Sequence, residues 1–277
     1  MKNTIVRHLL LYVSTALILL SCRKAPDTTI ITESHFEGEV ISSIEARNGW
    51  SITIENSADK SGIMLEYTAF LEEGIIMSLN DGKLILDLQN VSGALYSSTL
   101  HATIYSSQLS SLSFSNNVRT DIIGEFCADS VIMALSRNSS CRGGRFISKQ
   151  MSVVADKSDI ADIEFVGERA DINLVASRMA GRINATTSQD INLDGSSFVN
   201  YSGQTLSVRL AAKNASIANT VSNEAAVVLI ELEGGSTITA NVIDSISGYV
   251  KEGSSLYYVG NPTLNLDVDE SSSVKRL

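Results

Sequence analysis

The sequence is poor in histidine, cysteine, proline and aromatic residues. Its 277 residues include three His, three Cys, two Pro and one Trp, and aromatic residues make up 6%. A catalytic triad would have to use His35 or His101, since His8 lies in the predicted signal segment, and no Gly-x-Ser-x-Gly nucleophile motif is present. Few aromatics with abundant Ser, Asn and Gly favour a stacked β structure over a helical bundle. The sequence therefore predicts no catalytic residue.

Positive charge is also scarce. Lys and Arg total 21 against 31 Asp and Glu, which gives a formal net charge of −10. A nucleic-acid-binding surface needs clustered Lys and Arg, and the sequence contains no such cluster. We therefore expect no nucleic acid among its partners, and no motif indicates a cofactor. The acidic balance is typical of a surface that keeps a protein soluble.

The first residues have the pattern of a targeting segment. Lys2 and Arg7 precede an apolar run over residues 9–20, which is too short for a convincing membrane-spanning helix. The run ends in Leu19-Leu20-Ser21-Cys22, which resembles a bacterial lipobox. That resemblance implies a signal peptide over residues 1–21 and a lipid on Cys22. A plain secretory signal followed by a chance cysteine is the alternative.

The segment after Cys22 has the composition of a linker. Residues 22–35 include one of the two prolines, and their first part has no hydrophobic periodicity. We predict that they form a lipidated tether that holds a folded domain away from a bilayer. The expected location is the cell envelope, with the lipid inserted in the outer membrane; which side the domain faces is left open.

A short motif recurs through the second half of the chain at steps of about 18 to 20 residues. Each copy has a polar or charged residue, one or two small residues, Ser or Asp, and then an apolar residue. The copies are centred on Ser140, Asp159, Ser197, Ser216, Ser236, Ser255 and Ser273, with a degenerate copy at Arg178. This spacing is that of a solenoid, in which each coil buries its apolar side only against its neighbours. Short alternating strands precede the motif in each coil.

The residue that follows each Ser or Asp is predicted to form an apolar column through the stacked coils. Burial of one large apolar side chain in such a column is worth roughly 1.5–3 kcal/mol. Gly and Asn in the motif supply the positive φ that a tight corner needs. The predicted column is Cys141, Ile160, Met179, Phe198, Ile217, Leu256 and Val274, with Thr237 as a polar exception.

The region before the repeats has the pattern of strands and hairpins. Residues 51–55 alternate polar and apolar, and Asn80-Asp81-Gly82-Lys83 is a strong hairpin turn. We therefore predict an all-β fold over residues 36–274. It consists of a strand-rich N-terminal part, residues 36–108, and the regular coils of a parallel β-helix, residues 109–274.

These residues resemble a known family. The resemblance rests on the lipobox, on residues 48–54 and 81–86, and on Leu109-Ser110-Ser111-Leu112 leading into the repeated turns. Residues 253–262 resemble the end of the same family domain. It is the DUF2807 family, also called the autotransporter adhesin head GIN domain family. The resemblance covers about residues 36–274, and it implies a right-handed parallel β-helix in an envelope lipoprotein.

Cys127 and Cys141 are the two cysteines other than Cys22, the predicted lipidation site. Both are in apolar surroundings of the sequence, Cys141 within the predicted column, and we expect two buried free thiols. A disulfide is the alternative, because the protein is expected in an oxidising compartment. No His is near either cysteine in sequence, so a metal or nucleophilic site is not indicated.

Carboxylates and tyrosines supply the candidate ligand surface. Asp156, Asp159 and Asp162 cluster in sequence, and stacked carboxylates can bind Ca²⁺ or act in sugar cleavage. A solvated turn explains the same cluster, and the Gly-rich Ca²⁺ repeat is absent, so no metal site is predicted. Exposed aromatic side chains could stack on sugars. The candidates are Tyr201, Tyr249, Tyr257 and Tyr258, and core packing is the alternative for about half of them.

Two functions compete on these observations, besides a purely structural envelope protein with no ligand of its own. The first is a non-enzymatic envelope lipoprotein whose flat β-helix face binds a partner, a glycan or a protein. The second is a polysaccharide lyase or hydrolase, which requires a cleft where Asp156, Asp159 and Arg178 converge. Coordinates that place these side chains on different faces would argue against the second.

Overall fold

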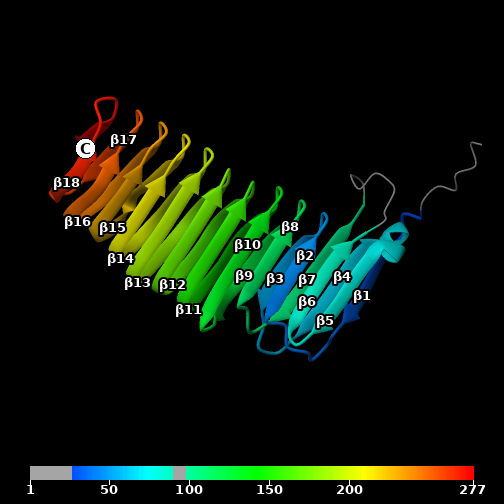
Figure 1. The fold of residues 1–277 in the computed structure, drawn as a ribbon. Coiled ribbons are helices and arrows are strands. Elements are labelled where there is room, and N and C mark those ends of the chain that lie inside the picture. Colours follow the sequence, from blue (N-terminus) through cyan, green and yellow to red (C-terminus); the bar gives the residue numbers. More distant parts are fainter. Residues whose placement is uncertain (1–26, 90–97) are drawn as a thin grey trace, which may run out of the picture.

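The chain forms a β-solenoid. The computed structural model describes residues 27–89 and 98–277. In these ranges nearly all regular structure is strand, wound into about nine turns (Figure 1). Every pairing among the strands after residue 110 is parallel. The prediction of an all-β parallel solenoid is confirmed.

Two parallel sheets make up the long faces of the solenoid. The first face carries β2 (Ser43–Arg47), β6 (Lys83–Leu88), β8 (Ser111–Ser115), β10 (Ser130–Ser136) and β18 (Thr263–Val268). The second face carries β3 (Ser51–Asn56), β7 (Leu100–Ser106), β9 (Arg119–Cys127), β17 (Ser255–Val259) and β19 (Ser273–Arg276).

Six longer strands bend at one long edge and contribute to both faces. Their first halves lie on the second face and their second halves on the first face, where β10 joins them. These strands are β11 (Ser140–Asp156), β12 (Asp159–Val175), β13 (Arg178–Asp194), β14 (Phe198–Ala212), β15 (Ile217–Leu232) and β16 (Thr237–Val250).

Alternation of side chains explains why these segments form half-buried strands. In β10, Val131, Met133 and Leu135 are buried, whereas Ile132 between them is 50% exposed. A strand places successive side chains on opposite sides, so every second residue points into the space between the two sheets. Stacking aligns these inward residues from coil to coil, and the buried residues form one continuous core.

The other long edge consists of tight corners, most of them built on two consecutive residues with positive φ. Examples are Asn116-Asn117, Arg137-Asn138 and Gly234-Gly235. Gly and Asn tolerate this conformation better than other residues. The residue directly after the pair turns inward and is buried, as Val118, Ser139 and Ser236 are. The corner therefore determines which residues of the following strand point inward.

A ladder of buried serines links these corners. The backbone N–H of Ser197 donates to Ser216 Oγ at 3.2 Å, and the N–H of Ser216 donates to Ser236 Oγ at 3.1 Å. The same bond recurs from Ser158 to Ser177 and from Ser236 to Ser254. Each hydroxyl thus satisfies a backbone donor that the corner leaves buried.

The apolar column lies two residues after each of these serines, which corrects part of the prediction. Cys141, Ile160, Met179, Leu256 and Val274 are in it as predicted. In the three coils between, the prediction is wrong by one residue, because the inward serine is itself Ser197, Ser216 or Ser236. Phe198, Ile217 and Thr237 point outward, and the column continues through Val199, Ala218 and Ile238.

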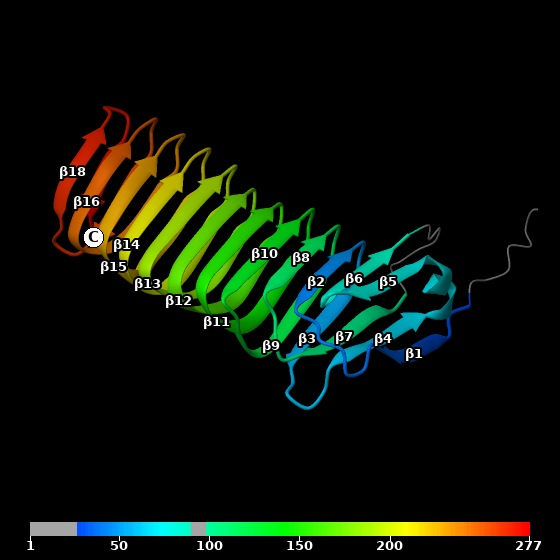
Figure 2. The same cartoon turned by 60° about the horizontal axis from the view of Figure 1, so that its bottom comes forward.

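The N-terminal end combines further coils with an antiparallel cap (Figure 2). β2–β3 and β6–β7 are coils themselves, and β2–β3 lies between β6–β7 and β8–β9 although it comes first in the chain. The cap consists of β1 (Ile30–His35), β4 (Gly62–Thr68), the 3-10 helix η1 (Ala69–Gly74) and β5 (Ile75–Asn80). Its pairings are antiparallel: β4 pairs with β7, and β5 pairs with β6.

Two boundaries differ from the prediction. Residues 30–35, assigned to the tether, form β1, which pairs antiparallel with β4. The coils begin at β2 and not at residue 109, since β2, β3, β6 and β7 already stack in parallel. The hairpin predicted at Asn80-Asp81-Gly82-Lys83 is confirmed by the antiparallel pairing of Asn80 with Lys83.

Residues 1–26, with the predicted signal peptide and Cys22, lie outside the described residues. Within the described part of the chain, no helix has the length and apolar character needed to cross a bilayer.

Candidate functional site

A hollow in the solenoid surface lies on the first face and is centred on β14. Three outward residues of this strand are Ser207, Arg209 and Ala211. A large side chain thus stands between two small ones. The neighbouring strands align Asn192 and Glu231 with Ala211. Because Ala211 does not fill the space between those two side chains, the surface is hollowed there.

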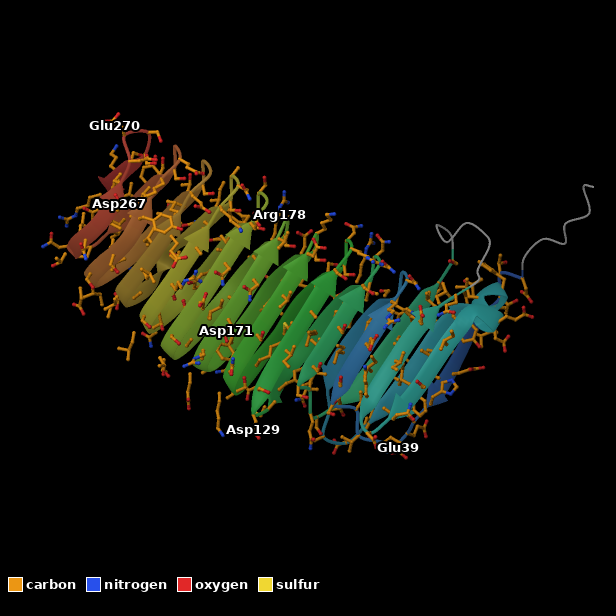
Figure 3. All side chains as sticks on the ribbon, in the orientation of Figure 1. Glu39, Asp129, Asp171, Arg178, Asp267 and Glu270 are labelled. Carbon is orange, nitrogen blue, oxygen red and sulfur yellow. The ribbon has the colours of Figure 1, made fainter. Side chains whose placement is uncertain are left out.

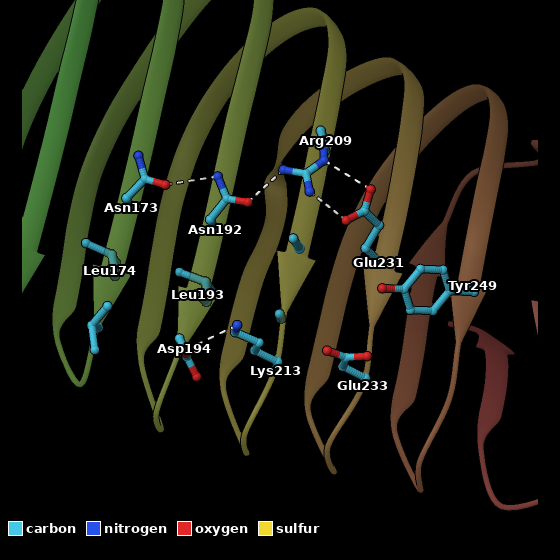
Figure 4. A pocket seen from close by; sticks show the side chains of 13 residues that line it. Asn173, Leu174, Asn192, Leu193, Asp194, Arg209, Lys213, Glu231, Glu233 and Tyr249 are labelled. Carbon is cyan, nitrogen blue, oxygen red and sulfur yellow. Dashed lines mark hydrogen bonds and ion pairs between the residues drawn. The ribbon is translucent and has the colours of Figure 1, made fainter.

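The hollow beside Ala211 has a volume of about 330 Å³. Its walls come from five consecutive strands, β12 to β16, and Figure 4 shows the side chains converging on it. The lining mixes polar and apolar residues, with one aromatic ring at the C-terminal side. It comprises Asn173, Leu174, Val175, Asn192, Leu193, Asp194, Arg209, Ala211, Ala212, Lys213, Glu231, Glu233 and Tyr249.

A second hollow of about 330 Å³ lies on the other side of Arg209. It is lined by Arg169, Asp171, Ser188, Gln189, Asp190, Ser207, Val208, Arg209, Val227 and Leu229. Val227 and Leu229 are 42% and 37% exposed, so the floor of this hollow has an apolar part. Arg209 lines both hollows, and we call them together the Arg209 groove.

Arg209 is held in place by residues of the two neighbouring coils. Its Nε and Nη2 donate to the two carboxylate oxygens of Glu231 at 3.1 and 2.5 Å. Its Nη1 donates to Asp190 Oδ1 at 3.0 Å and to Asn192 Oδ1 at 2.6 Å. The hydrogen bonds from Arg209 to Glu231 raise the pKa of Arg209 further, with Asp190 adding to the effect. The guanidinium is therefore a fixed positive group in the groove.

Several other polar residues of the groove are also connected to one another. Asn192 Nδ2 donates to Asn173 Oδ1 at 3.0 Å, which continues the chain of hydrogen bonds to β12. Lys213 Nζ is 3.4 Å from Asp194 Oδ2. Asn214 donates to Asp194 at 2.6 Å, and this bond, helped by Lys213, lowers the pKa of Asp194. Asp194 thus remains ionised in mildly acidic solution.

Tyr249 closes the groove on its C-terminal side. Burial raises the pKa of the Tyr249 phenol, and the carboxylates of Glu233 and Glu231 raise it further. The Lys251 Nζ lies 5.4 Å from the centroid of the ring, a cation–π contact. The ring is therefore fixed on one side, and its hydroxyl stays protonated at neutral pH.

The three predicted carboxylates do not meet. Asp156 ends β11 on the first face, and its cross-strand neighbour Val175, not Asp156, lines the groove. Asp159 lies on the second face beside Arg178, across the corner from Asp156. Asp162 lies further along the second face, 2.8 Å from Arg142 Nε. The cleft required for the lyase or hydrolase hypothesis is therefore not formed by these residues.

Charged residues lie along both long edges of the solenoid. Figure 3 shows Arg178 and Glu270 along the edge of tight corners, and Asp129 and Glu39 along the opposite edge. Across residues 27–89 and 98–277, no group of three or more His, Cys, Asp or Glu side chains could hold a metal ion.

Of the predicted tyrosines, one is in the groove. Tyr249 lines it, whereas Tyr257 is half-buried on the second face and Tyr258 is packed against the core. Tyr201 was predicted at the surface, and this is wrong. It is 2% exposed, and its hydroxyl donates to Gln189 Oε1 at 2.7 Å inside the core.

The cysteines are both free, as expected, but only one is buried. Cys141 is in the apolar column, where burial raises the pKa of its thiol to about 12. Cys127 is exposed at the end of β9, which corrects the expectation of two buried thiols. The strand alternation explains this, because Phe126 occupies the inward position beside it.

Most residues of the groove were missed by the sequence analysis. Arg209, Glu231, Asp190 and Asn192 are ordinary polar residues of alternating strands, and no local motif contains more than two of them. A usable signal exists once coils are aligned: opposite charges then stand at neighbouring outward positions of successive coils.

Comparison with known proteins gives matches to one family and to solved structures of the same fold. A family model described as "Putative auto-transporter adhesin, head GIN domain" (DUF2807) matches residues 42–262. A structure described as a "putative adhesin" from Parabacteroides distasonis has a TM-score of 0.62 at 13% identity, covering 91% of this chain and 98% of that chain. One from Parabacteroides merdae has a TM-score of 0.57 at 11% identity, with the same coverage. No curated protein matches.

Proposed function

Because the chain belongs to the DUF2807 head GIN domain family, we propose that it is a non-enzymatic, adhesin-like protein of the cell envelope that binds a partner through the Arg209 groove. The observation that carries this proposal is the fixed network around Arg209. Its polar side chains come from several coils and line the two hollows that Ala211 and Ser207 leave open. Such pre-ordered polar groups reduce the entropy that binding costs.

The lipid anchor is part of the same proposal. A lipid on Cys22 would attach the solenoid to the outer membrane by its capped end, since β1 begins at Ile30. From β1 to β14 the second-face sheet advances by eight strand spacings, or roughly 38 Å at about 4.8 Å each. The groove would then stand well clear of the bilayer surface.

Lipidation is tested by metabolic labelling of cells that produce the chain with an alkyne fatty acid. We expect label on the wild-type chain and none on Cys22→Ala, with both variants exported. Equal labelling of the two chains would contradict a lipid on Cys22.

Binding through the groove is tested on arrays of polysaccharides and of extracellular proteins. We expect the wild-type chain to retain a binding partner that Ala211→Trp loses, because the indole fills the hollow. Asn200→Trp is the matched control, since Asn200 is an outward residue of the same strand on the second face. A folded wild-type chain that binds nothing on either array would refute the proposed function.

A further inference from the structure

The chemistry of the Arg209 groove restricts the class of ligand, and the restriction rests on the proposed function. The donors at the centre of the groove, those of Arg209 and Asn192, already have partners. Arg209 has five N–H groups, and four of its hydrogen bonds go to Glu231, Asp190 and Asn192. Asn192 donates to both Asn173 and Asp190.

Acceptors, in contrast, are in surplus. An ionised carboxylate offers about four lone-pair sites, and the groove contains those of Asp194, Glu231 and Glu233 beside Asp190. Glu231 uses one site on each oxygen for Arg209. A ligand that fits this balance must bring several hydrogen-bond donors of its own.

Charges of both signs line the same hollow, which disfavours an ionic ligand. Arg209 and Lys213 would meet a cationic ligand, and Glu231, Glu233 and Asp194 would meet an anionic one. An ion of either sign would be desolvated next to a like charge, and such juxtaposition costs binding free energy. A neutral ligand with hydroxyl groups donates to the carboxylates and still accepts from the cations.

The two hollows are arranged for an extended ligand. Ser207 and Ala211, which open them, are four residues apart on one strand, or about 13 Å. The hollow beside Ser207 adds the exposed side chains of Val227 and Leu229 to serine hydroxyls and charged groups. This mixture suits a molecule that carries both C–H surface and hydroxyls.

We infer that the Arg209 groove binds an uncharged oligosaccharide that lies along β14 across Arg209. One sugar unit occupies the hollow beside Ala211, where its hydroxyls donate to Glu231, Glu233 and Asp194. Another occupies the hollow beside Ser207, with C–H groups against Val227 and Leu229. Tyr249 bounds the site toward β16.

The test is calorimetric titration of the full chain in detergent with three kinds of probe. The first is a panel of neutral oligosaccharides of glucose, mannose, galactose, xylose and N-acetylglucosamine; the others are polygalacturonate and polylysine. We expect binding of at least one neutral oligosaccharide with an affinity that is nearly the same at low salt and in about 0.5 M NaCl, because no net charge is neutralised. Ala211→Trp and Ser207→Trp should each lower that affinity about tenfold or more, whereas Asn200→Trp leaves it within about twofold.

Each result of the titration either supports the inference or contradicts a named part of it. Salt-sensitive binding of only polygalacturonate or polylysine, lost in Ala211→Trp, would overturn the ligand class and leave the proposed function standing. Neutral oligosaccharide binding that survives both tryptophan substitutions would overturn the placement. A folded chain that binds none of the probes would overturn the inference, and array binding to a protein would then show whether the proposed function stands. Circular dichroism establishes that each variant is folded; two groove variants are used so that misfolding of one does not remove the test.

Discussion

At the scale of single residues, the inward serines of the corners connect one coil to the next. Ser216 is fully buried, accepts the Ser197 N–H and donates to the Lys213 carbonyl at 2.7 Å. A buried backbone N–H without a partner costs about 1–3 kcal/mol. The serine hydroxyls therefore accept buried backbone N–H groups at the corners, as carbonyl groups of neighbouring strands do along the faces.

Replacement of Ser216 by Ala should lower the free energy of unfolding by about 1–3 kcal/mol, because the buried Ser197 N–H loses its acceptor. Chemical denaturation measures the change. Ser152→Ala is the control: Ser152 is a partly exposed residue of β11, and its substitution should have an effect near zero. Equal effects of the two substitutions would contradict the role of the ladder.

The buried hydroxyl of Tyr201 makes a similar contribution within the core. It donates to Gln189 and lies 3.4 Å from Asn223 Nδ2, and all three residues are buried. Tyr201→Phe should destabilise the protein by about 1 kcal/mol. Tyr257→Phe, at a half-buried position on the second face, should leave the thermal midpoint unchanged. A midpoint that is the same in Tyr201→Phe would contradict this account.

The two thiols should differ in reactivity. Cys127 is exposed, whereas Cys141 is buried with its pKa raised to about 12, so its thiolate form is scarce and inaccessible. We expect iodoacetamide to alkylate Cys127 in the native protein and Cys141 only after unfolding. Peptide mapping by mass spectrometry measures both sites. Rapid native alkylation of Cys141 would show that the core is open.

At this scale the sequence predicts corners well and registers less well. The serines of Gly195-Ser196-Ser197 and Gly253-Ser254-Ser255 look alike, but Ser197 is inward in the first and Ser254 in the second. The positive-φ pair is Gly195-Ser196 in one corner and Glu252-Gly253 in the other. Which pair adopts positive φ is decided by stacking on the neighbouring coil, and this information is not local.

At the scale of elements, close approach of adjacent strands makes some glycines irreplaceable. A Cβ on Gly248, in β16, would lie 1.9 Å from the carbonyl oxygen of Ile230 in β15. A Cβ on Gly253, at a corner, meets nothing within 4 Å, although both residues have positive φ. The two positions therefore separate steric overlap from backbone strain.

Gly253→Ala should cost about 1–2 kcal/mol, the strain of a non-glycine residue at positive φ. Gly248→Ala carries that strain and a further cost of about 1–3 kcal/mol, because β15 and β16 must move apart. Thermal unfolding of both variants measures the difference. Equal midpoints would mean that the strands separate easily.

The turn between β18 and β19 should be sensitive to acid. Hydrogen bonds from the Ser272 hydroxyl and from the Glu252 N–H lower the pKa of Asp269 from 3.8 to about 2. A lowered pKa means that the ionised carboxylate stabilises the folded state above about pH 4, and that this stability is lost as the pH falls toward 2. Asp269→Asn should show a smaller loss of stability than the wild type between these two pH values. Circular dichroism measures the acid titration of both proteins. Equal losses of stability in the two proteins would contradict the assignment.

Elements were predictable where their signals are local. The hairpin between β5 and β6 follows from Asn80-Asp81-Gly82-Lys83, and the strands from alternation. The order of the N-terminal coils was not predictable, because β2–β3 is inserted between coils that come later in the chain. Pairings of that kind depend on contacts between distant segments.

At the scale of the whole molecule, function depends on the alignment of coils. The Arg209 groove draws on residues from Arg169 to Tyr249, and only Tyr249 was among the predicted site residues. Arg209 meets Asp190 and Glu231 at separations of 19 and 22 residues, and Glu231 is a diagonal neighbour, because the register pairs Arg209 with Leu229. Stacking places these side chains on one face as a preformed binding surface.

The central claim is that a neutral oligosaccharide occupies this face, and methyl NMR tests it most directly. The chain is labelled at alanine methyl groups and titrated with the neutral oligosaccharide that binds best. Ala211 lies in the groove, and Ala180 is an outward residue on the second face of the neighbouring strand β13. We predict that the Ala211 signal shifts with added ligand while the Ala180 signal stays in place. A shift at Ala180 with none at Ala211 would contradict the account.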